Sequence, residues 1–163
     1  MNRHQIKKGH VMTIKNVSIF DMDGTIIDSS HRQATLPDGT LNLPAWIENA
    51  TPEKIAQDTV LPLAKQVAKR KQAGDYVLIC TARAMSPADF DFLKNHGICV
   101  DKIISRPLGN NEPDGQLKAK QLKKLFNLKQ FKAASKIMFD DAASVRSALR
   151  KIGIAVLDPQ KVH

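Results

Sequence analysis

The sequence has few cysteines, few aromatic residues and no long apolar run. Only two of its 163 residues are cysteines, Cys80 and Cys99, and both lie in apolar surroundings. A disulfide framework is therefore excluded, and we expect two reduced, buried thiols in a cytosolic protein. The longest apolar runs, residues 77–80 and 152–157, are far shorter than the roughly 20 residues of a membrane-spanning helix. The N-terminus also lacks the apolar segment of a signal peptide, so we expect no membrane contact.

Acidic residues are scarce relative to basic ones. The chain has 25 Lys and Arg residues against 16 Asp and Glu residues, which gives a formal net charge of +9. A basic surface attracts polyanions, which favours a nucleic acid or a nucleotide as the substrate, but solvated helix faces would produce the same composition. The excess is carried by Arg3, Lys7, Lys8 and Lys15, then Lys65, Lys69, Arg70 and Lys71, then Lys118, Lys120, Lys123, Lys124, Lys129, Lys132 and Lys136.

Length and apolar content indicate one domain with a substantial core. The chain is 42% apolar and only 5% aromatic, and it contains no internal repeat. We expect residues 1–15 to form a flexible basic tail, in which Met12 is an alternative start to Met1. Residues 16–163 are expected to form the single domain.

Short apolar runs alternate with segments of helical periodicity along this domain. Such alternation predicts an α/β fold, a three-layer doubly wound parallel sheet with helices on both faces. Residues 28–43 are expected to be a polar loop, with Pro44 as punctuation and a short helix start at residues 51–53. The expected strands are residues 17–21, 76–80, 102–105, 136–139 and 154–157, and the longer helices are residues 62–73, 86–97, 116–126 and 143–151.

The most informative stretch is residues 17–25, an apolar run that ends in two acids, a glycine and a threonine. A buried parallel strand reads as a continuous apolar run, and ligands collect at the carboxyl ends of such strands. Asp21 and Asp23 repel each other, and their arrangement becomes favourable when they share a cation such as Mg²⁺. An acidic Asp-Gly turn after a strand is the alternative interpretation.

Two further predicted strands also end in polar residues, and these deliver Thr81, Arg83, Asp140 and Asp141. A doubly wound sheet would bring the three strand ends together in one crevice. Carboxylates clustered there would bind Mg²⁺, which completes its octahedron with water and substrate phosphate. One carboxylate could attack phosphorus while a second acid protonates the leaving oxygen. The pattern therefore predicts phosphoryl transfer.

Four motifs resemble those of the haloacid dehalogenase (HAD) superfamily phosphatases. They are residues 20–25, residues 78–83, Lys118 and residues 138–141, and they occur in the family's order within about residues 16–158. The resemblance implies an HAD-like Rossmannoid fold, and the connector between the first two motifs has room for at most a very small cap insert. It also implies a Mg²⁺-dependent mechanism with an aspartyl-phosphate intermediate.

The resemblance implies a role for each acid of the predicted crevice. Asp21 would be the nucleophile, and Asp23 would be the general acid and base, with a backbone carbonyl that also meets Mg²⁺. Asp141 would be a metal ligand supported by Asp140. These four residues together make up the expected magnesium site.

The same resemblance implies phosphate-binding groups around these acids. Thr81 would donate to the phosphate, and Lys118 would be the cation beside nucleophile and phosphate. Lys120 is a neighbouring lysine, but it would project from a different helix face. The other motif residues expected at the substrate are Gly24, Thr25 and Ala82.

A narrower resemblance is to the 3′-phosphatase domain of phage-type polynucleotide kinase-phosphatases. The residues that carry it are 28–32, Trp46, 81–83, 105–107 and Asp114. It implies that Arg32, Arg83 and Asp114 support the substrate phosphate or the lysine, and Arg106 is also expected to bind substrate. No GxxxxGK[ST] stretch occurs, so a P-loop kinase activity is not expected. Trp46 would anchor the connector or stack a base, and His31 would assist binding or be solvated.

We therefore predict a Mg²⁺-dependent phosphomonoesterase that removes 3′-phosphates from nucleic-acid ends. A 5′-(deoxy)nucleotidase acting on nucleoside monophosphates shares the same motifs and is the enzymatic alternative. A non-catalytic nucleic-acid-binding protein on an HAD scaffold is the third hypothesis, against which the intact motif residues argue. The resemblance to phage proteins implies the host cytoplasm as the location, and the sequence indicates no particular oligomeric state.

Overall fold

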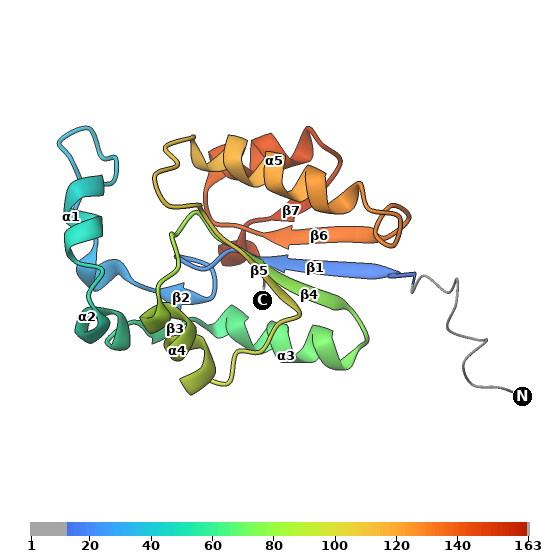
Figure 1. Ribbon diagram of the computed structural model, residues 1–163, viewed down its shortest axis with the longest axis horizontal. Coiled ribbons are helices and arrows are strands. Elements are labelled where there is room, and N and C mark those ends of the chain that lie inside the picture. The colour runs from blue at the N-terminus through green and yellow to red at the C-terminus, as the bar shows by residue number, and fades with distance from the viewer. Residues whose placement is uncertain (1–12, 163) are drawn as a thin grey trace, which may run out of the picture.

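The computed structural model describes residues 13–162 as a parallel sheet between two layers of helices (Figure 1). The sheet has five strands in the order β5-β4-β1-β6-β7, and each neighbouring pair is parallel. This order confirms the predicted doubly wound α/β fold and places β1 at the centre. The strands are β1 (Asn16–Phe20), β4 (Tyr76–Cys80), β5 (Lys102–Ile104), β6 (Ser135–Phe139) and β7 (Ala155–Leu157).

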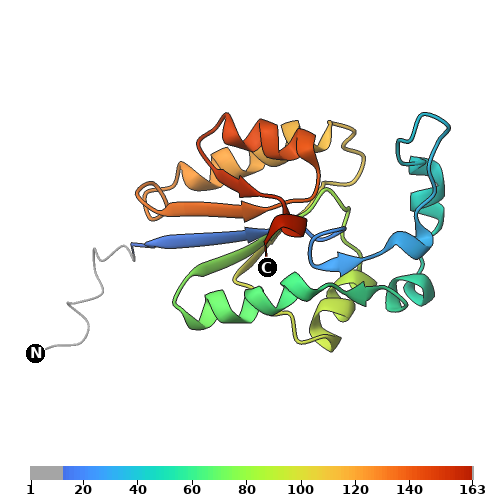
Figure 2. The ribbon, with the colours of Figure 1, turned by 180° about the vertical axis from the view of Figure 1, so that it is seen from behind.

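Two pairs of helices form the outer layers (Figures 1 and 2). One face of the sheet is covered by α5 (Asp114–Phe126) and α6 (Ala143–Arg150), and the other by α3 (Lys65–Gln72) and α4 (Pro87–Asn95). All five carboxyl ends of the strands consequently meet at one edge of the sheet. Within residues 13–162, no helix combines the length and apolar composition needed to cross a membrane.

The central strand supplies side chains to both cores. Successive side chains of a strand point to opposite faces of the sheet. Ile19 accordingly packs with Leu122 and Leu149 beneath α5 and α6, whereas Phe20 packs with Val67 and Phe92 beneath α3 and α4. Because β1 is buried on both faces, its sequence is a continuous apolar run rather than an alternating one.

A short insert between β1 and β4 lies at the carboxyl ends of the strands, at the left of Figure 1. Its small size agrees with the expectation of a very small cap. The insert contains β2 (Ile27–Asp28), the 3₁₀ turn η1 (Ser30–Arg32), α1 (Leu43–Glu48), α2 (Pro52–Ala56) and β3 (Thr59–Val60). Two more 3₁₀ turns, η2 (Pro62–Ala64) and η3 (Pro159–Lys161), precede α3 and follow β7.

The sequence analysis missed the helix α1 and the strands β2 and β3 of the insert. Pro44 does not interrupt the chain but belongs to the first turn of α1, where proline is tolerated because no N–H is needed. The Asn42 side chain caps this helix by accepting a hydrogen bond from Ala45 N (3.2 Å). The strands β2 and β3 pair in antiparallel orientation and join residues about 30 positions apart, such as Asp28 and Thr59. Each strand has only two residues, which is too short to show an alternation of apolar and polar side chains.

The predicted flexible tail lies mostly outside the described residues. The structure describes Thr13 to Lys15, and two of these residues are hydrogen-bonded to the loop and strand after α5. Ile14 N donates to Gln130 O (3.1 Å), and Lys15 O accepts from Ser135 N (2.9 Å). The chain is therefore held to the domain from Ile14 onward.

The two cysteines differ in exposure. Cys80 is fully buried at the end of β4, and burial raises the pKa of its thiol to about 12. Cys99 is exposed, so the expectation of two buried thiols is wrong for this residue. The reason is that Ile98 takes the inward position after α4, and the next side chain points outward.

Candidate active site

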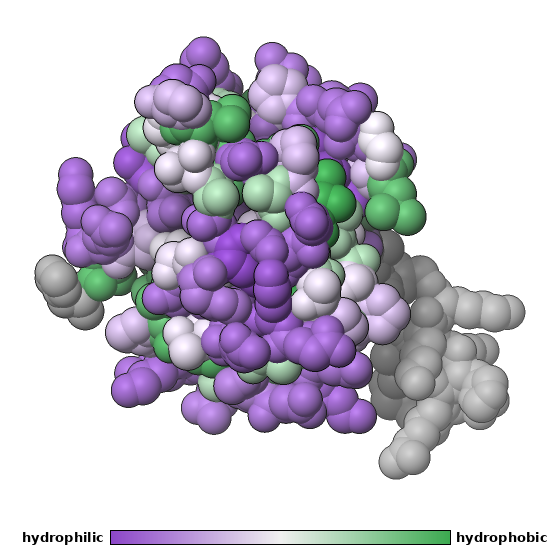
Figure 3. All heavy atoms as spheres, turned by 90° about the vertical axis from the view of Figure 1, so that its left-hand side faces the viewer, coloured by the Kyte–Doolittle hydropathy of each residue, from purple (hydrophilic) through white to green (hydrophobic). Residues whose placement is uncertain are grey.

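The candidate site lies at the carboxyl end of β1. Asp21 directly follows this strand, and its N–H donates to Phe139 O of β6 (3.0 Å), so the sheet itself fixes the residue. The chain then turns sharply, because Met22 O accepts from the N–H groups of Thr25 (3.1 Å) and Ile27 (3.0 Å). The molecular face above this edge is predominantly hydrophilic (Figure 3).

The turn after Asp21 requires a glycine. Gly24 has a φ of +77°, a left-handed conformation that favours glycine. A Cβ atom at this position would also overlap the Asp141 carboxylate. The ends of β1 and β6 therefore meet, as the sequence predicted, and Gly24 is what lets them approach.

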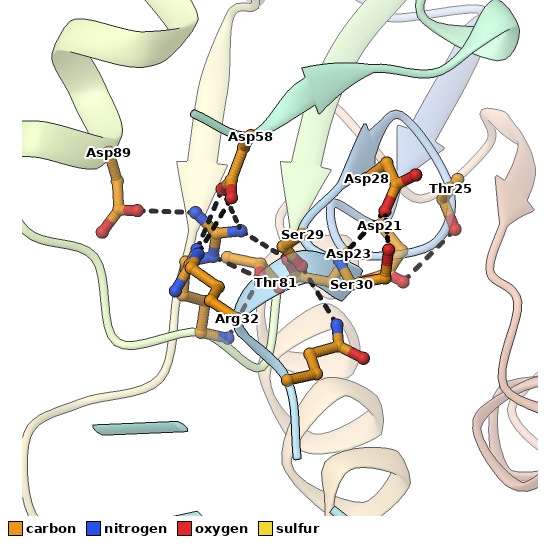
Figure 4. Close-up of polar contacts among 12 residues, drawn as sticks. Asp21, Asp23, Thr25, Asp28, Ser29, Ser30, Arg32, Asp58, Thr81 and Asp89 are labelled. Carbon is orange, nitrogen blue, oxygen red and sulfur yellow. Dashed lines mark hydrogen bonds and ion pairs between the residues drawn. The ribbon is translucent and has the colours of Figure 1, made fainter. Parts of the chain in front are cut away.

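Asp21 is a buried carboxylate with a cation beside it. The residue is only 6% exposed. Oδ1 accepts from Lys118 Nζ (2.8 Å), and Oδ2 accepts from the Thr25 hydroxyl (3.3 Å; Figure 4). Burial raises the pKa of the Asp21 carboxyl, the Lys118 charge opposes this rise, and Asp140 adds to it. A second cation at the site would favour the ionised, nucleophilic form of Asp21.

Lys118 reaches inward from α5 and bridges two acids. Its Nζ donates to Asp21 Oδ1 (2.8 Å) and to Asp140 Oδ2 (2.7 Å). Burial disfavours the charged amine, but the carboxylates of Asp21 and Asp140 outweigh it and raise the pKa of Lys118. Lys120 is exposed and contacts Glu112 instead (3.3 Å). The two lysines thus lie on different faces of α5, as the helical periodicity predicted.

Three carboxylates lie close enough together to hold a metal ion. Oxygens of Asp21, Asp140 and Asp141 are within 4.8 Å of one another. Carboxylate oxygens are the hard ligands that Mg²⁺ prefers, and Lys118 offsets only one of the three negative charges. The donor set therefore fits a divalent cation. We call Asp21, Lys118, Asp140 and Asp141 the lysine cluster.

Asp23, the expected acid and base, is paired with an arginine rather than with the lysine cluster. Asp23 Oδ2 accepts from Arg83 Nε (3.2 Å), and Oδ1 accepts from Arg83 Nη2 and from the Ser29 hydroxyl (2.6 Å; Figure 4). Arg83 Nη1 donates to Asp89 Oδ1 (2.6 Å). Burial of Arg83 opposes its charge, but Asp23 and Asp89 together raise its pKa.

A second arginine lies beside this pair. Arg32 is 2% exposed and donates through Nε and Nη2 to the two oxygens of Asp58, both at 2.9 Å. Asp58 also contacts His31 Nε2 (2.7 Å) and lies 3.6 Å from Arg83 Nη2. The Trp46 ring covers Arg32, with Cζ 4.2 Å from the ring centroid. We call Asp23, Arg32, Asp58, Arg83 and Asp89 the arginine cluster.

The remaining residues predicted to bind substrate include Thr81, Arg106 and Asp114, and they differ in burial and in their contacts. Thr81 is buried, and its hydroxyl accepts from Arg83 N (3.0 Å). Arg106 donates to Ala82 O (2.8 Å) and to Asp114 Oδ1 (2.7 Å). The exposed Asp114 carboxylate pairs with Arg106, whereas Lys118 pairs with Asp21 and Asp140. A role of Asp114 beside the lysine or the substrate phosphate stays a prediction.

A family model described as "Bacteriophage T5 5′-deoxynucleotidase" matches residues 1–163 of the chain. The chain belongs to the phage T5 5′-deoxynucleotidase family. It is therefore an enzyme, a hydrolase of the phosphatase or nucleotidase class. This assignment favours catalysis over the hypothesis of a non-catalytic scaffold.

This 5′-deoxynucleotidase family member is similar to known proteins in sequence and in fold. The 5′-deoxynucleotidase of Escherichia phage T5 is 31% identical over 170 residues, which cover 92% of this chain and 69% of that protein. A chain of the Pnkp1/Rnl/Hen1 complex has a TM-score of 0.62 at 20% identity, over 91% of this chain but only 47% of that one. A haloacid dehalogenase-like hydrolase from Streptococcus pneumoniae has a TM-score of 0.61 at 16% identity, covering 88% and 84% of the two chains. The two structural likenesses show the HAD fold.

Sequence reasoning missed two acids of this 5′-deoxynucleotidase family member's site. Asp58 follows α2 in a stretch without any motif, and nothing in its spacing points to the arginines it binds. Asp89 lies near the start of the helix predicted at residues 86–97, and its Oδ2 accepts a hydrogen bond from Ser86 N (2.7 Å). The other oxygen of Asp89 binds Arg83, which the helix-capping pattern does not reveal.

Proposed function

We propose that the protein is a Mg²⁺-dependent 5′-deoxynucleotidase that removes the phosphate from deoxynucleoside 5′-monophosphates. The observation that carries this proposal is the pairing of Asp21 with Lys118 inside a group of three carboxylates. The relative from phage T5 is named a 5′-deoxynucleotidase, which supports a mononucleotide rather than a nucleic-acid end as the substrate. Its phage origin supports a place of action in the cytoplasm of an infected bacterium.

Asp21 acts as the nucleophile in this proposal. One of its oxygens attacks phosphorus, the bond from phosphorus to O5′ breaks, and an aspartyl-phosphate forms. Position and environment support the role, since the strand end holds the residue and Lys118 favours its ionised form. Lys118 stays protonated throughout and stabilises charge on the phosphoryl oxygens.

Asp23 supplies and then accepts the proton. Its carboxylic acid donates to O5′ as the deoxynucleoside leaves, and its carboxylate then takes a proton from the water that attacks the aspartyl-phosphate. The second step releases inorganic phosphate and restores the Asp21 carboxylate. Both steps require Asp23 to turn from Arg83, which holds it in the structure, toward Asp21.

Asp21, Asp140 and Asp141 would hold Mg²⁺, together with the backbone carbonyl of Asp23. When bound, the ion supplies positive charge that offsets the carboxylates and the phosphate. Thr81 and the amides of the turn around Gly24 are the neutral donors we place at the phosphate. Arg83 is the cation we expect to bind the phosphate after Asp23 has left it.

A substrate panel tests the proposal. Phosphate release is measured with deoxynucleoside 5′-monophosphates, the matching ribonucleotides, deoxynucleoside 3′-monophosphates and an oligonucleotide with a 3′-phosphate, each with Mg²⁺ and with EDTA. We expect the highest kcat/KM for the deoxynucleoside 5′-monophosphates and no turnover in EDTA. The Asp21→Asn variant controls for contaminating phosphatases.

The panel also decides between the two enzymatic hypotheses. A higher kcat/KM for the 3′-phosphorylated oligonucleotide would replace the nucleotidase by the polynucleotide 3′-phosphatase that the narrower resemblance predicted. Equal rates in Mg²⁺ and EDTA would contradict the metal requirement. No hydrolysis of any substrate by the folded protein would refute the proposed function.

A further inference from the structure

The two helical layers carry different kinds of surface. In the layer of α5 and α6, residues 115–139 and 142–157 contain no Asp or Glu, and the only acids in between, Asp140 and Asp141, belong to the lysine cluster. Six exposed lysines lie in this acid-free part of the chain, and one of them, Lys120, is paired with Glu112. We call the other five the basic face. They are Lys123, Lys124, Lys129, Lys132 and Lys151.

None of these five lysines forms an ion pair with an acid of residues 13–162. The layer of α3 and α4 differs in that acids lie among its cations and pair with two of them, although Lys65, Lys69 and Lys94 form no ion pair with the described residues. Lys71 lies 3.6 Å from Asp101, and Arg70 lies 3.9 Å from Asp75. The positive charge of the α5–α6 layer is therefore not neutralised within the described protein.

The lysines of α5 point outward because its apolar residues point inward. Leu117 and Leu122 are buried in the core, and Leu125 and Phe126 pack against it. Lys118 is the inward exception, and it serves the lysine cluster. The basic face thus presents ammonium groups without a row of apolar side chains that could insert between lipids. Such a surface is better suited to binding a polyanion than to binding a membrane.

The N-terminal end of the described chain adjoins the same face. Ile14 N is hydrogen-bonded to Gln130 O (3.1 Å), and Gln130 lies in the loop that carries Lys129 and Lys132. The twelve residues before Thr13 contain Arg3, Lys7 and Lys8 and no acid. The sequence that precedes the described residues is therefore basic as well.

We propose that the basic face binds the phosphodiester backbone of nucleic acids at a site separate from the catalytic centre. Lysines bind phosphates as point charges, and their number sets affinity and salt dependence without base specificity. The catalytic residues lie at the carboxyl ends of the strands. Lys123 and Lys124 lie in the last turn of α5, and Lys129 and Lys132 lie in the loop from α5 to the amino end of β6 (Figure 1). A bound strand on this face leaves the catalytic edge open.

The test is fluorescence anisotropy of a labelled 20-nucleotide single strand with hydroxyl groups at its unlabelled end. The full-length protein is titrated in EDTA, so that neither a terminal phosphate nor catalysis contributes. We expect a Kd of about 1–100 µM at physiological salt. For five phosphate contacts, the plot of log K against log salt should have a slope of about −3.5.

Two variants with the same net charge separate this face from general basicity. The first carries Lys123→Gln, Lys124→Gln, Lys129→Gln and Lys132→Gln; the second carries Lys65→Gln, Lys69→Gln, Lys71→Gln and Lys94→Gln in the opposite layer. Both lower the formal charge of +9 by four. We expect the first variant to bind about 10-fold or more weakly, with a slope smaller by about 3, and the second to bind nearly as the wild type does.

A third variant addresses the N-terminal segment. Replacing Arg3, Lys7 and Lys8 by Gln in the full chain should weaken binding further when combined with the first variant. Hydrolysis of a mononucleotide should be unchanged in all of them, and this readout keeps a failure of the proposed function distinct from a failure of the basic face.

Three results would overturn the inference. They are no binding by the wild-type protein, equal losses in the two matched variants, and tighter binding to anionic phospholipid vesicles than to the oligonucleotide. The last result would identify the basic face as a membrane-binding surface.

Discussion

The lysine cluster and the arginine cluster lie at the same edge of the sheet but balance their charges differently. In the lysine cluster, the group of three carboxylates contains one ammonium group, which contacts Asp21 and Asp140, while Asp141 is exposed. In the arginine cluster, three carboxylates share two guanidinium groups, and Asp23, Asp58 and Asp89 each accept three hydrogen bonds.

This difference in charge balance suits the two clusters to different tasks, metal binding in one and the positioning of side chains in the other. An excess of negative charge beside solvent favours a cation from solution, so the lysine cluster suits metal-assisted chemistry. A buried network in which each polar group is satisfied fixes positions instead. Asp23 connects the two, because it lies two residues after the nucleophile in the chain while Arg83 holds its side chain.

The largest effect is expected from Asp21→Asn in the lysine cluster. An amide cannot form the aspartyl-phosphate, so kcat should fall by about 10⁴-fold or more. The fold should persist, because Asn has the same shape and Lys118 keeps its contact with Asp140. Phosphate release and circular dichroism measure the two properties. Wild-type turnover in this variant would assign the attack to another group.

Lys118→Met should have the next largest effect. It leaves two buried carboxylates without their shared cation, and the free energy of unfolding should fall by about 3–5 kcal/mol in urea denaturation without metal. Lys120→Met is the matched control on the exposed face of α5 and should change it by less than about 0.5 kcal/mol. Equal losses in both variants would mean that the buried pairs contribute no net stability.

Breaking the arginine cluster at Asp58 tests its positioning role. Asp58→Ala leaves the Arg32 guanidinium buried without its carboxylate, and we expect a loss of roughly 3 kcal/mol in the free energy of unfolding. Asp91→Ala, at an exposed position of α4, is the control. If Asp58→Ala is as stable as this control, the arginine cluster does not tie the insert to the domain.

Asp141→Asn tests the metal-binding side of the comparison. It removes one carboxylate from the three-carboxylate group. Loss of a group that only supports a metal ligand already weakens metal binding by roughly 10-fold. We therefore expect the Mg²⁺ concentration for half-maximal activity to rise by at least about 10-fold. Saturating Mg²⁺ should restore most of kcat. An unchanged Mg²⁺ titration would place the ion away from Asp141.

The smallest effect is expected from Trp46→Leu. Loss of the ring over Arg32 should cost about 1 kcal/mol in the free energy of unfolding. If Trp46 only anchors the insert, KM should change equally for a deoxynucleotide and for p-nitrophenyl phosphate. A rise in KM for the deoxynucleotide alone would instead assign Trp46 to base stacking.

The sequence predicted the lysine cluster better than the arginine cluster, and the reason is physical. Asp21, Asp140 and Asp141 follow apolar strands, and parallel strands of one sheet must end at one edge. Helical periodicity was then enough to select Lys118 over Lys120. Every member of the lysine cluster is thus placed by regular secondary structure.

The arginine cluster depends on irregular segments. Asp58 lies between α2 and β3, and the pairing of β3 with β2 brings it to Arg32. Strands of two residues are too short for the sequence pattern to predict them. The sequence named Arg32 and Arg83 as partners of substrate but contained no pattern that paired them with Asp58 and Asp89. Long-range contacts between loops are decided by packing rather than by local propensity.

Arg83 has a consequence for protein engineering. It lies after β4, yet it contacts Asp89 at the start of α4, Asp23 in the turn after β1 and, at 3.6 Å, Asp58 in the insert. A chimaera that received the insert of another HAD enzyme would leave this guanidinium facing a foreign surface. Graft boundaries should therefore carry residues 83–89 along with the insert, because the two segments form one exchangeable unit.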